Sequence, residues 1–430
     1  MSLSLASPLK IRAYSAPRTQ SQLAWFYLKN AMPILFSLPK QSLPFVLLAT
    51  QHKPTVPAKK RISHFASWVL VCLGQMLLSP NALADNESPS TNINASDTSS
   101  STLSAYLEGY YLHDFNQSNA RSRPSFAYSH NAVETAKVNL GLVKLNHQAD
   151  NTRLNLALGA GSYMRSNYAA EPQTLQHLLE ANVGIKLGHN LWLDAGVMPS
   201  HIGFESAIGL DNWTLTRSIL ADNSPYFETG VKLSYASDDG KWLASGLLLN
   251  GWQKINPKDG STNPALGYQL SYKANANTTL NSSAYLGEEQ GTDGKRTRYF
   301  HNFYGQFQLS DRWQAIIGLD TGAEQAAAHA KHHHVWFSPV ALLQYRYSDR
   351  VTVTTRAEYY QDANQVIVKT NGGNGFKTWA YSANLDYKVS QHFTVRTELR
   401  GFDSQDAIFP DNSGYASQSM LATSAAIWHY

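Results

Sequence analysis

The sequence contains almost no cysteine and no long apolar run. Its single cysteine, Cys72, lies in a short apolar stretch near the N-terminus, so the chain beyond it has no disulfide and no thiol nucleophile. A helix that spans a bilayer needs about 20 consecutive apolar residues. The longest comparable stretch, Trp68 to Leu78, is shorter and is interrupted by Gly74 and Gln75. The sequence therefore excludes a helical membrane protein.

Charged residues are also scarce. They make up 15% of the 430 residues, whereas aromatic residues reach 11%, with 23 Tyr and 10 Trp. A transmembrane β-barrel combines few charges and many aromatics with a modest average hydropathy, because its apolar residues alternate with polar ones along each strand. Composition therefore favours a barrel over other membrane proteins.

Acidic residues are missing from the first 84 positions, which contain nine Lys or Arg. This segment accounts for the formal net charge of +4, because the rest of the chain holds 26 basic and 31 acidic residues, a net charge of −5. The basic balance of the whole chain therefore gives no reason to expect a nucleic-acid partner.

The same N-terminal part predicts a secretion signal, with a basic start at residues 59–61, the apolar stretch described above and an Ala-Leu-Ala pattern ending at Ala84. Cleavage is expected after Ala84. A misplaced start codon would explain the residues that precede the signal. The predicted parts are an N-terminal extension (1–57), a signal peptide (58–84), a flexible polar linker (85–101) and an outer-membrane barrel (103–430).

From Leu103 onward, apolar residues alternate with polar ones at a period of two, which is typical of strands with one wet and one apolar face. The fold class predicted is all-β, a transmembrane antiparallel β-barrel of about 16 strands. The strands are expected to begin near Leu103, Lys137, Thr152, Leu175, Leu191, Phe227, Trp242, Ala265, Thr278, Arg298, Trp313, Val335, Val351, Phe376, Phe393 and Gln418.

The connections between these segments alternate in length. Short ones such as 148–151 and 348–350 are separated by long ones such as 116–136, 198–225 and 403–417. Outer-membrane barrels of Gram-negative bacteria have short periplasmic turns and long external loops. Aromatic residues also gather near the short turns, where rings prefer the boundary between headgroups and hydrocarbon. We therefore predict a multi-pass β-barrel in the bacterial outer membrane, in contact with lipid and lipopolysaccharide.

The chain ends in a strand with aromatic residues, Trp428 and Tyr430. This ending resembles the C-terminal assembly signal of outer-membrane proteins, which implies recognition by the barrel-assembly machinery. Further segments, Leu191 to Gly196, Ile202 to Glu205 and Asp211 to Trp213, are similar to the β-barrel porin family called OmpL-like, over most of residues 103–430. The resemblance implies a porin-like protein and brings no set of functional residues with it.

The predicted function is passive diffusion of small hydrophilic solutes or ions, because a barrel of sixteen strands leaves an aqueous lumen unless something fills it. No cofactor is expected, and a homotrimer would be usual for this size. A structural or adhesive barrel is one alternative. An outer-membrane enzyme is another, although the sequence has no G-x-S-x-G, H-E-x-x-H or phosphate-binding glycine motif. Neighbouring Ser129 and His130 point to opposite sides of an extended chain, and Asp238 and Asp239 suit a turn.

The connection from Met198 to Pro225, the third external loop, is too apolar to stay in water, so we expect it to fold into the lumen. Asp211 is a plausible cap for a helix in its second half. Acidic residues of the loop would oppose a basic wall and create a transverse field, unless the loop packs on a trimer partner. The predicted constriction residues are Glu205, Asp211, Arg217, Arg356, Glu358, Arg396, Glu398 and Arg400.

A histidine-rich segment from Ala326 to His334 offers the weak metal candidates of the sequence. A short helix there would place His329 and His333 on one face, a spacing that suits zinc or copper. The alternative is a solvated external loop, and it is favoured because no carboxylate or thiolate completes the set. No metal is therefore expected.

Overall fold

The computed structural model of the chain describes residues 99–257 and 263–430. The predicted N-terminal extension, the signal peptide with its cleavage site after Ala84 and most of the predicted linker lie outside the described residues. Within the described ranges, no helix has the length and hydrophobicity that crossing a membrane requires.

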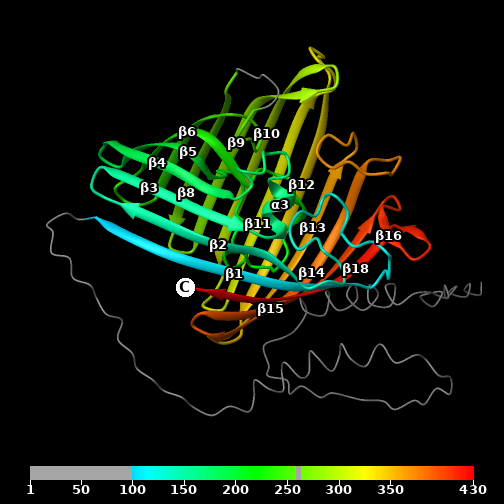
Figure 1. Cartoon of the computed structure of the whole chain (residues 1–430). Coiled ribbons are helices and arrows are strands. Elements are labelled where there is room, and N and C mark those ends of the chain that lie inside the picture. The colour runs from blue at the N-terminus through cyan, green and yellow to red at the C-terminus, as the bar shows by residue number, and fades with distance from the viewer. Residues whose placement is uncertain (1–98, 258–262) are drawn as a thin grey trace, which may run out of the picture. The chain divides into compact units, whose positions relative to one another are not determined.

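Sixteen strands of the described part form a closed antiparallel barrel, in which β1 pairs with β18 to complete the ring (Figure 1). The predicted fold class is confirmed. The barrel strands are β1 (Ser100–Asp114), β2 (Lys137–Gln148), β3 (Thr152–Ala160), β4 (Leu178–Gly188), β5 (Leu191–Pro199), β6 (Phe227–Ala236), β7 (Trp242–Leu249), β8 (Ala265–Asn275), β9 (Thr278–Gly291), β10 (Gly294–Gln308), β11 (Trp313–Gln325), β12 (His333–Arg346), β13 (Val351–Asp362), β14 (Phe376–Ser390), β15 (Phe393–Ser404) and β18 (Gln418–His429).

The other described elements belong to the connections. A small hairpin of β16 (Phe409–Asp411) and β17 (Gly414–Ala416) lies between β15 and β18. Helix α3 (Ser162–Asn167) follows β3, and the 3-10 helix η1 (Gly209–Asp211) and helix α4 (Ile219–Asp222) lie between β5 and β6. These short elements cover or enter the ends of the barrel, and none of them interrupts the ring of strands.

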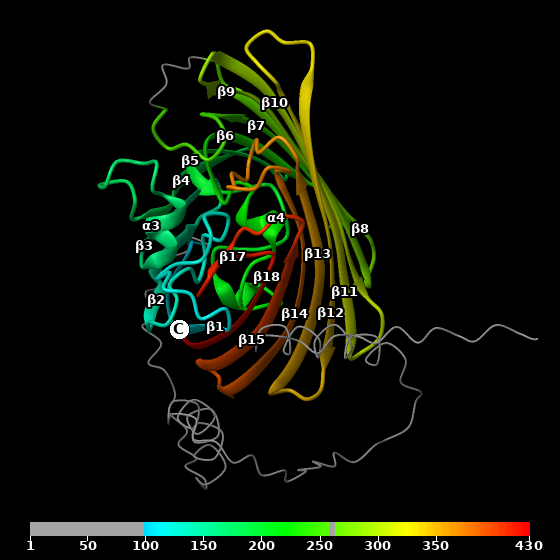
Figure 2. The same ribbon diagram turned by 90° about the vertical axis from the view of Figure 1, so that its right-hand side faces the viewer.

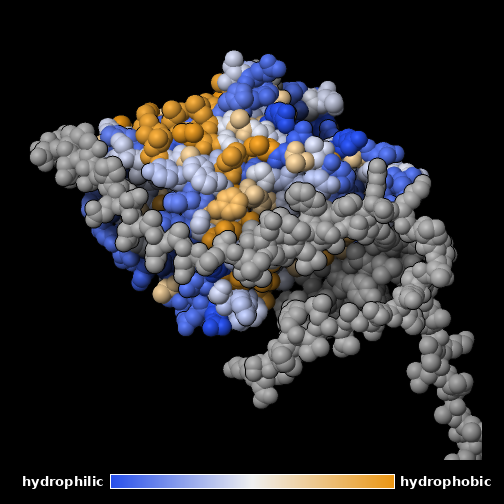
Figure 3. Space-filling model, turned by 60° about the horizontal axis from the view of Figure 1, so that its bottom comes forward, coloured by the Kyte–Doolittle hydropathy of each residue, from blue (hydrophilic) through white to orange (hydrophobic). Residues whose placement is uncertain are grey.

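The alternation in sequence becomes an inner and an outer face. In β13, Arg356, Glu358 and Tyr360 are buried, whereas Ala357 and Tyr359 between them are partly exposed. Successive strand residues point to opposite faces, so the polar row faces the lumen. The outer wall instead carries exposed apolar side chains, and they gather in orange patches in Figure 3. They include Leu103, Leu158, Val183, Ile185, Leu248, Leu266, Ile317 and Val335.

Aromatic pairs lie on neighbouring strands beside the short turns. Trp242 of β7 pairs with Tyr272 of β8, and their ring centroids are 4.2 Å apart. Trp313 of β11 pairs with Tyr345 of β12 at 4.6 Å. Both tryptophans are exposed on the outer wall. Such cross-strand pairs stabilise a sheet and place rings where a membrane boundary would favour them.

The predicted short turns are confirmed, but three boundaries differ. β9 and β10 are joined by residues 292–293 alone, so one predicted long loop is in fact a tight hairpin at the end of two long strands. β4 begins at Leu178 rather than near Leu175, because Leu178 N donates to Leu175 O in a turn. β1 begins at Ser100, so the last residues assigned to the linker already pair with β2.

An apolar cluster fills part of the barrel interior. Phe126, in the β1–β2 connection, contacts Phe376, Phe402 and Phe409, with centroid distances of 4.8, 6.1 and 6.3 Å. These rings come from the connection, from β14 and β15 and from the β16–β17 hairpin. The β1–β2 connection and the β16–β17 hairpin therefore pack against the inner side of β14 and β15.

Candidate functional site

The connection between β5 and β6, residues 200–226, is called the lumen loop here. Figure 2 shows its helix α4 inside the ring of strands. The helix is capped by Ser218, whose side chain accepts a hydrogen bond from Ala221 N at 3.3 Å. The predicted cap at Asp211 is wrong, since Asp211 lies in η1 and is followed by an extended Asn212. The loop residues between η1 and α4 lie outside any helix. Their backbone amides and carbonyls therefore need hydrogen-bond partners in other parts of the barrel.

The first part of the lumen loop is attached to the wall formed by β6, β9 and β10. His201 Nδ1 lies 2.7 Å from Glu228 Oε2, and His201 Nε2 lies 2.8 Å from Ala284 O. Gly203 N donates to Asn302 Oδ1 at 3.3 Å. Since His201, Glu228 and Asn302 are all buried, these contacts fix the point where the loop leaves β5.

The middle of the lumen loop lies against β13, β14 and β15 on another part of the wall. Leu215 N donates to Asn384 Oδ1 at 3.0 Å. Three wall arginines donate to backbone carbonyls of the loop: Arg356 to Thr216 O at 2.7 Å, Arg396 to Gly209 O at 2.6 Å and Arg400 to Arg217 O at 2.7 Å. The wall side chains therefore supply the hydrogen-bond donors that the loop carbonyls need.

Wall carboxylates complete this attachment from the same strands. Glu398 accepts a hydrogen bond from Thr216 N at 2.6 Å, and Glu358 accepts one from Ile219 N at 2.5 Å. The two glutamates also pair with arginines, Glu398 with Arg356 at 2.9 Å and Glu358 with Arg400 at 2.6 Å. Buried charges are tolerated when they are paired and hydrogen-bonded. The wall is therefore a balanced network of both signs.

The predicted constriction residues divide into two groups. Arg356, Glu358, Arg396, Glu398 and Arg400 come together beneath the lumen loop and are at most 2% exposed. Four of them contact the loop backbone and one another, whereas Arg396 contacts the loop backbone and Asp386. These side chains therefore do not form the predicted basic wall that faces open space.

Glu205 and Arg217 are buried within the loop itself. Glu205 accepts hydrogen bonds from Ser218 N at 3.0 Å and Ser218 Oγ at 2.9 Å, and it lies 3.9 Å from Arg356. Burial raises the pKa of the Glu205 carboxyl above its ordinary value, although Arg356 and Ser218 favour the charged form. Arg217 lies over the rings of Tyr226 and Tyr163, at 3.8 and 4.6 Å from their centroids.

Asp211 differs from the other acidic candidates because it is exposed. It accepts the Ser206 hydroxyl at 3.0 Å and lines a cavity of about 330 Å³ beside the loop. Lys144 of β2, Glu180 of β4 and Tyr304 of β10 also line this cavity. None of these three was among the predicted constriction residues. Their positions on inward faces were predictable, but their grouping depends on the path of the loop.

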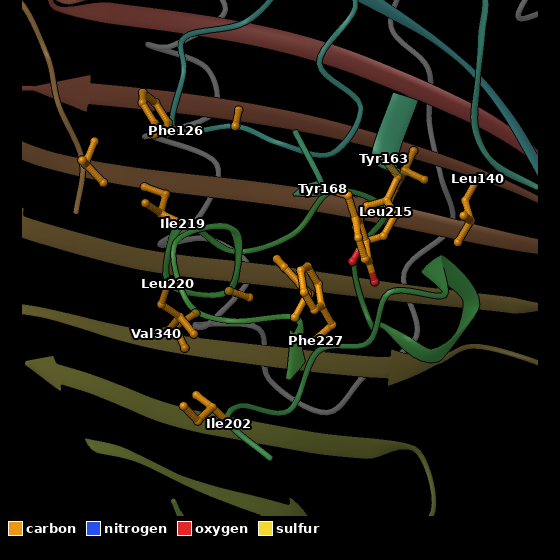
Figure 4. Packing of buried hydrophobic residues seen from close by; sticks show 14 of the residues in the cluster. Phe126, Leu140, Tyr163, Tyr168, Ile202, Leu215, Ile219, Leu220, Phe227 and Val340 are labelled. Carbon is orange, nitrogen blue, oxygen red and sulfur yellow. The ribbon is translucent and has the colours of Figure 1, made fainter. Parts of the chain in front are cut away.

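The β1–β2 connection also contacts the lumen loop. Ser129 Oγ donates to Asp222 Oδ1 at 3.3 Å, whereas His130 Nε2 lies 2.6 Å from Glu108 of β1. Neighbouring Ser129 and His130 thus contact different groups. The chain here is bent rather than extended as predicted, since His130 has a φ of 48°. Figure 4 shows Leu220 of α4 beside Val340 of β12. Polar contacts and apolar packing together fix both faces of α4.

The histidine-rich segment forms a turn rather than the short helix considered from sequence. His329 has a φ of 63°, and His333 already belongs to β12, paired with Gln325. A residue in a left-handed conformation cannot continue a right-handed helix, so the two imidazoles do not share a helical face. Within residues 99–257 and 263–430, no group of three or more metal-binding side chains is present.

Replacing Arg356 by Met is expected to release the lumen loop from the wall. The change leaves buried Glu398 without its arginine, and breaking a buried pair costs roughly 3–5 kcal/mol. Arg217 is the only trypsin site between residues 200 and 226 and is 3% exposed. We expect limited trypsinolysis of the folded barrel to cut at Arg217 in the variant and to spare it in the parent. The exposed Arg312→Met is the matched control; equal protection in all three proteins would show that Arg356 does not hold the loop.

The comparisons with known proteins concern the whole barrel. A family described as putative beta-barrel porin-2, OmpL-like, matches residues 100–428, which confirms the predicted resemblance. No curated protein matches the chain. Among solved structures, the anion-selective porin of Comamonas acidovorans is 10% identical, with a TM-score of 0.53 and coverage of 77% of this chain and 100% of that one. The outer membrane channel DcaP of Acinetobacter baumannii has the same identity and TM-score, with coverage of 77% and 97%. At this identity the likeness shows the fold alone.

Proposed function

We propose that this chain, which belongs to the OmpL-like beta-barrel porin family, lets small hydrophilic solutes or ions diffuse passively through its lumen. The family and the closed barrel make it an outer-membrane porin-like protein. The finer proposal is that the lumen loop narrows the passage. Selection by size and charge would then occur at the loop, without a cofactor or an energy source.

The observation that carries this proposal is the attachment of one loop to two separate parts of the inner wall. His201 and Gly203 bind the loop near β9 and β10, while Arg356 and Arg400 bind it on β13 and β15. A loop fixed at both places crosses the interior of the barrel and leaves space at its side. Sixteen strands alone would enclose a wider aqueous channel.

Conductance of the purified protein in planar bilayers tests the proposed function. We expect stepwise current increments in salt solution, and exclusion of solutes that are larger than the space beside the lumen loop. A reversal potential in a salt gradient would give the selectivity. A refolded barrel that inserts into the bilayer and carries no current would contradict passive diffusion and would favour the structural or adhesive alternative.

An enzymatic role receives no specific support from the site. The family and its barrel favour a channel without catalysis, and the buried carboxylates Glu205, Glu358 and Glu398 are occupied by backbone amides and arginines. A homotrimer, contact with lipopolysaccharide and recognition by the barrel-assembly machinery stay predictions.

A further inference from the structure

The cavity beside the lumen loop is lined by strands other than those that carry the anchoring arginines. Lys144 comes from β2, Glu180 from β4 and Tyr304 from β10, while Phe204 and Asp211 come from the loop. Its volume of about 330 Å³ is that of a small-molecule site. The cavity therefore has room for a compact organic solute next to the loop.

The charges around this cavity do not cancel. Lys144 Nζ lies 2.8 Å from Glu180 Oε2, so these two groups neutralise each other. Asp211 is exposed, and the Ser206 hydroxyl is the hydrogen-bond donor that its carboxylate has in the described part of the chain. Glu205 also lines the cavity, but its carboxylate accepts from Ser218 and is near Arg356. Asp211 is thus the carboxylate of this cavity that remains available to bind a group of a solute.

Aromatic rings supply the other half of the lining. Phe204 and Tyr304 contact each other edge to face, with centroids 5.5 Å apart, and both are partly exposed. An aromatic face attracts a cation and packs against an apolar group. An exposed carboxylate beside such rings is suited to a molecule that combines both properties.

We propose that this cavity is a subsite for small organic cations that carry an apolar group. The ammonium group would donate hydrogen bonds to Asp211, and the apolar part would contact Phe204 and Tyr304. The proposal rests on the proposed function, since a solute would reach the cavity from the lumen. It places solute recognition beside β2, β4 and β10 rather than on the strands that carry the arginine network.

Three probes that share one ring and differ in charge test the subsite. Benzylamine is a cation at neutral pH, benzyl alcohol is neutral and benzoate is an anion. We expect benzylamine to reduce the ion current through the parent channel in a saturable way, at concentrations at least about tenfold below those that the other two need. Equal block by benzoate would overturn the proposal and leave the porin function intact.

Two charge variants and a control sharpen the test. Asp211→Asn keeps the acceptor for Ser206 and should weaken the benzylamine block about tenfold, because a charge-assisted hydrogen bond is lost. Lys144→Gln frees Glu180 and should strengthen the block. Asp311→Asn removes the same charge from an exposed short turn and should change nothing. An unchanged block in Asp211→Asn and Lys144→Gln would show that benzylamine binds elsewhere.

A measurement without current separates this proposal from the proposed function. Isothermal titration of benzylamine into the detergent-purified parent and Asp211→Asn proteins reports binding even if the barrel conducts no ions. Saturable heat in the parent, weakened in the variant, supports the subsite whatever the conductance shows. Absence of saturable heat in the parent overturns it.

Discussion

Replacing Glu205 to Asp222 by a short Gly-Ser linker should raise the single-channel conductance roughly two- to fivefold, because the lumen of a sixteen-stranded barrel is wide once a loop no longer crosses it. The barrel should still fold, since the wall keeps its own ion pairs. Arg396 pairs with Asp386 at 2.6 Å and Arg400 with Glu358 at 2.6 Å without help from the loop. Conductance in planar bilayers measures the effect.

The same variant should shift modestly toward anions. The arginines that the loop covers are matched by acidic residues on the same wall, so their exposure adds no net charge. The deleted segment itself carries Glu205, Asp211 and Asp222 against Arg217 alone, so its removal takes away a net charge of −2. Replacing residues 326–332, the turn between β11 and β12, by Gly-Ser is the control and should leave conductance unchanged. A loop-deleted barrel that conducts like the parent would place the constriction elsewhere.

Deleting Trp428 to Tyr430 should abolish assembly of the barrel in the outer membrane. The deleted residues join both neighbours of the closing strand: Trp428 pairs with Leu107 of β1 and with Phe393 of β15. Tyr430 exchanges two backbone hydrogen bonds with Ala105, at 3.0 and 2.9 Å. Without them the closing edges lose pairing at the short-turn end, where unpaired strand edges promote aggregation. The amount of heat-modifiable barrel in outer-membrane fractions is the measurement.

A matched variant separates the aromatic signal from the backbone pairing. Trp428→Phe combined with Tyr430→Phe keeps the aromatic character and every backbone hydrogen bond, so assembly should stay near the parent level. Trp428→Ser with Tyr430→Ser keeps only the pairing. If the truncated chain reaches the outer membrane in normal amounts, the C-terminal strand is not the closing element that assembly requires.

The barrel was predictable from sequence because the pattern that defines each of its strands is local. A period of two and a run of turn residues define each strand without knowledge of its neighbours, and starts such as Lys137, Thr152 and Phe376 coincide with the structure. The hairpin of β9 and β10 was missed because its polar residues, such as Glu288 and Glu289, resemble a loop in composition, although they continue the strand pairing.

The site was less predictable because it depends on distant contacts. The apolar character of the lumen loop indicated burial, and the charged residues of β13 and β15 were predicted to line the constriction. Nothing local shows that Arg396 donates to Gly209 O and Asn212 O, at 2.6 and 2.8 Å, across 187 and 184 positions of the chain. For the same reason the cap at Ser218 was missed, since its role follows from where the loop bends.

The way in which the wall holds the lumen loop has a consequence for how this protein can diversify. Arg356, Arg396 and Arg400 donate to main-chain carbonyls, and Glu358 and Glu398 accept from main-chain amides. Every residue except proline offers both groups. Substitutions at exposed loop positions such as Asp211 therefore leave the anchors in place, so new solute preferences can arise in the loop without a matching change in the strands.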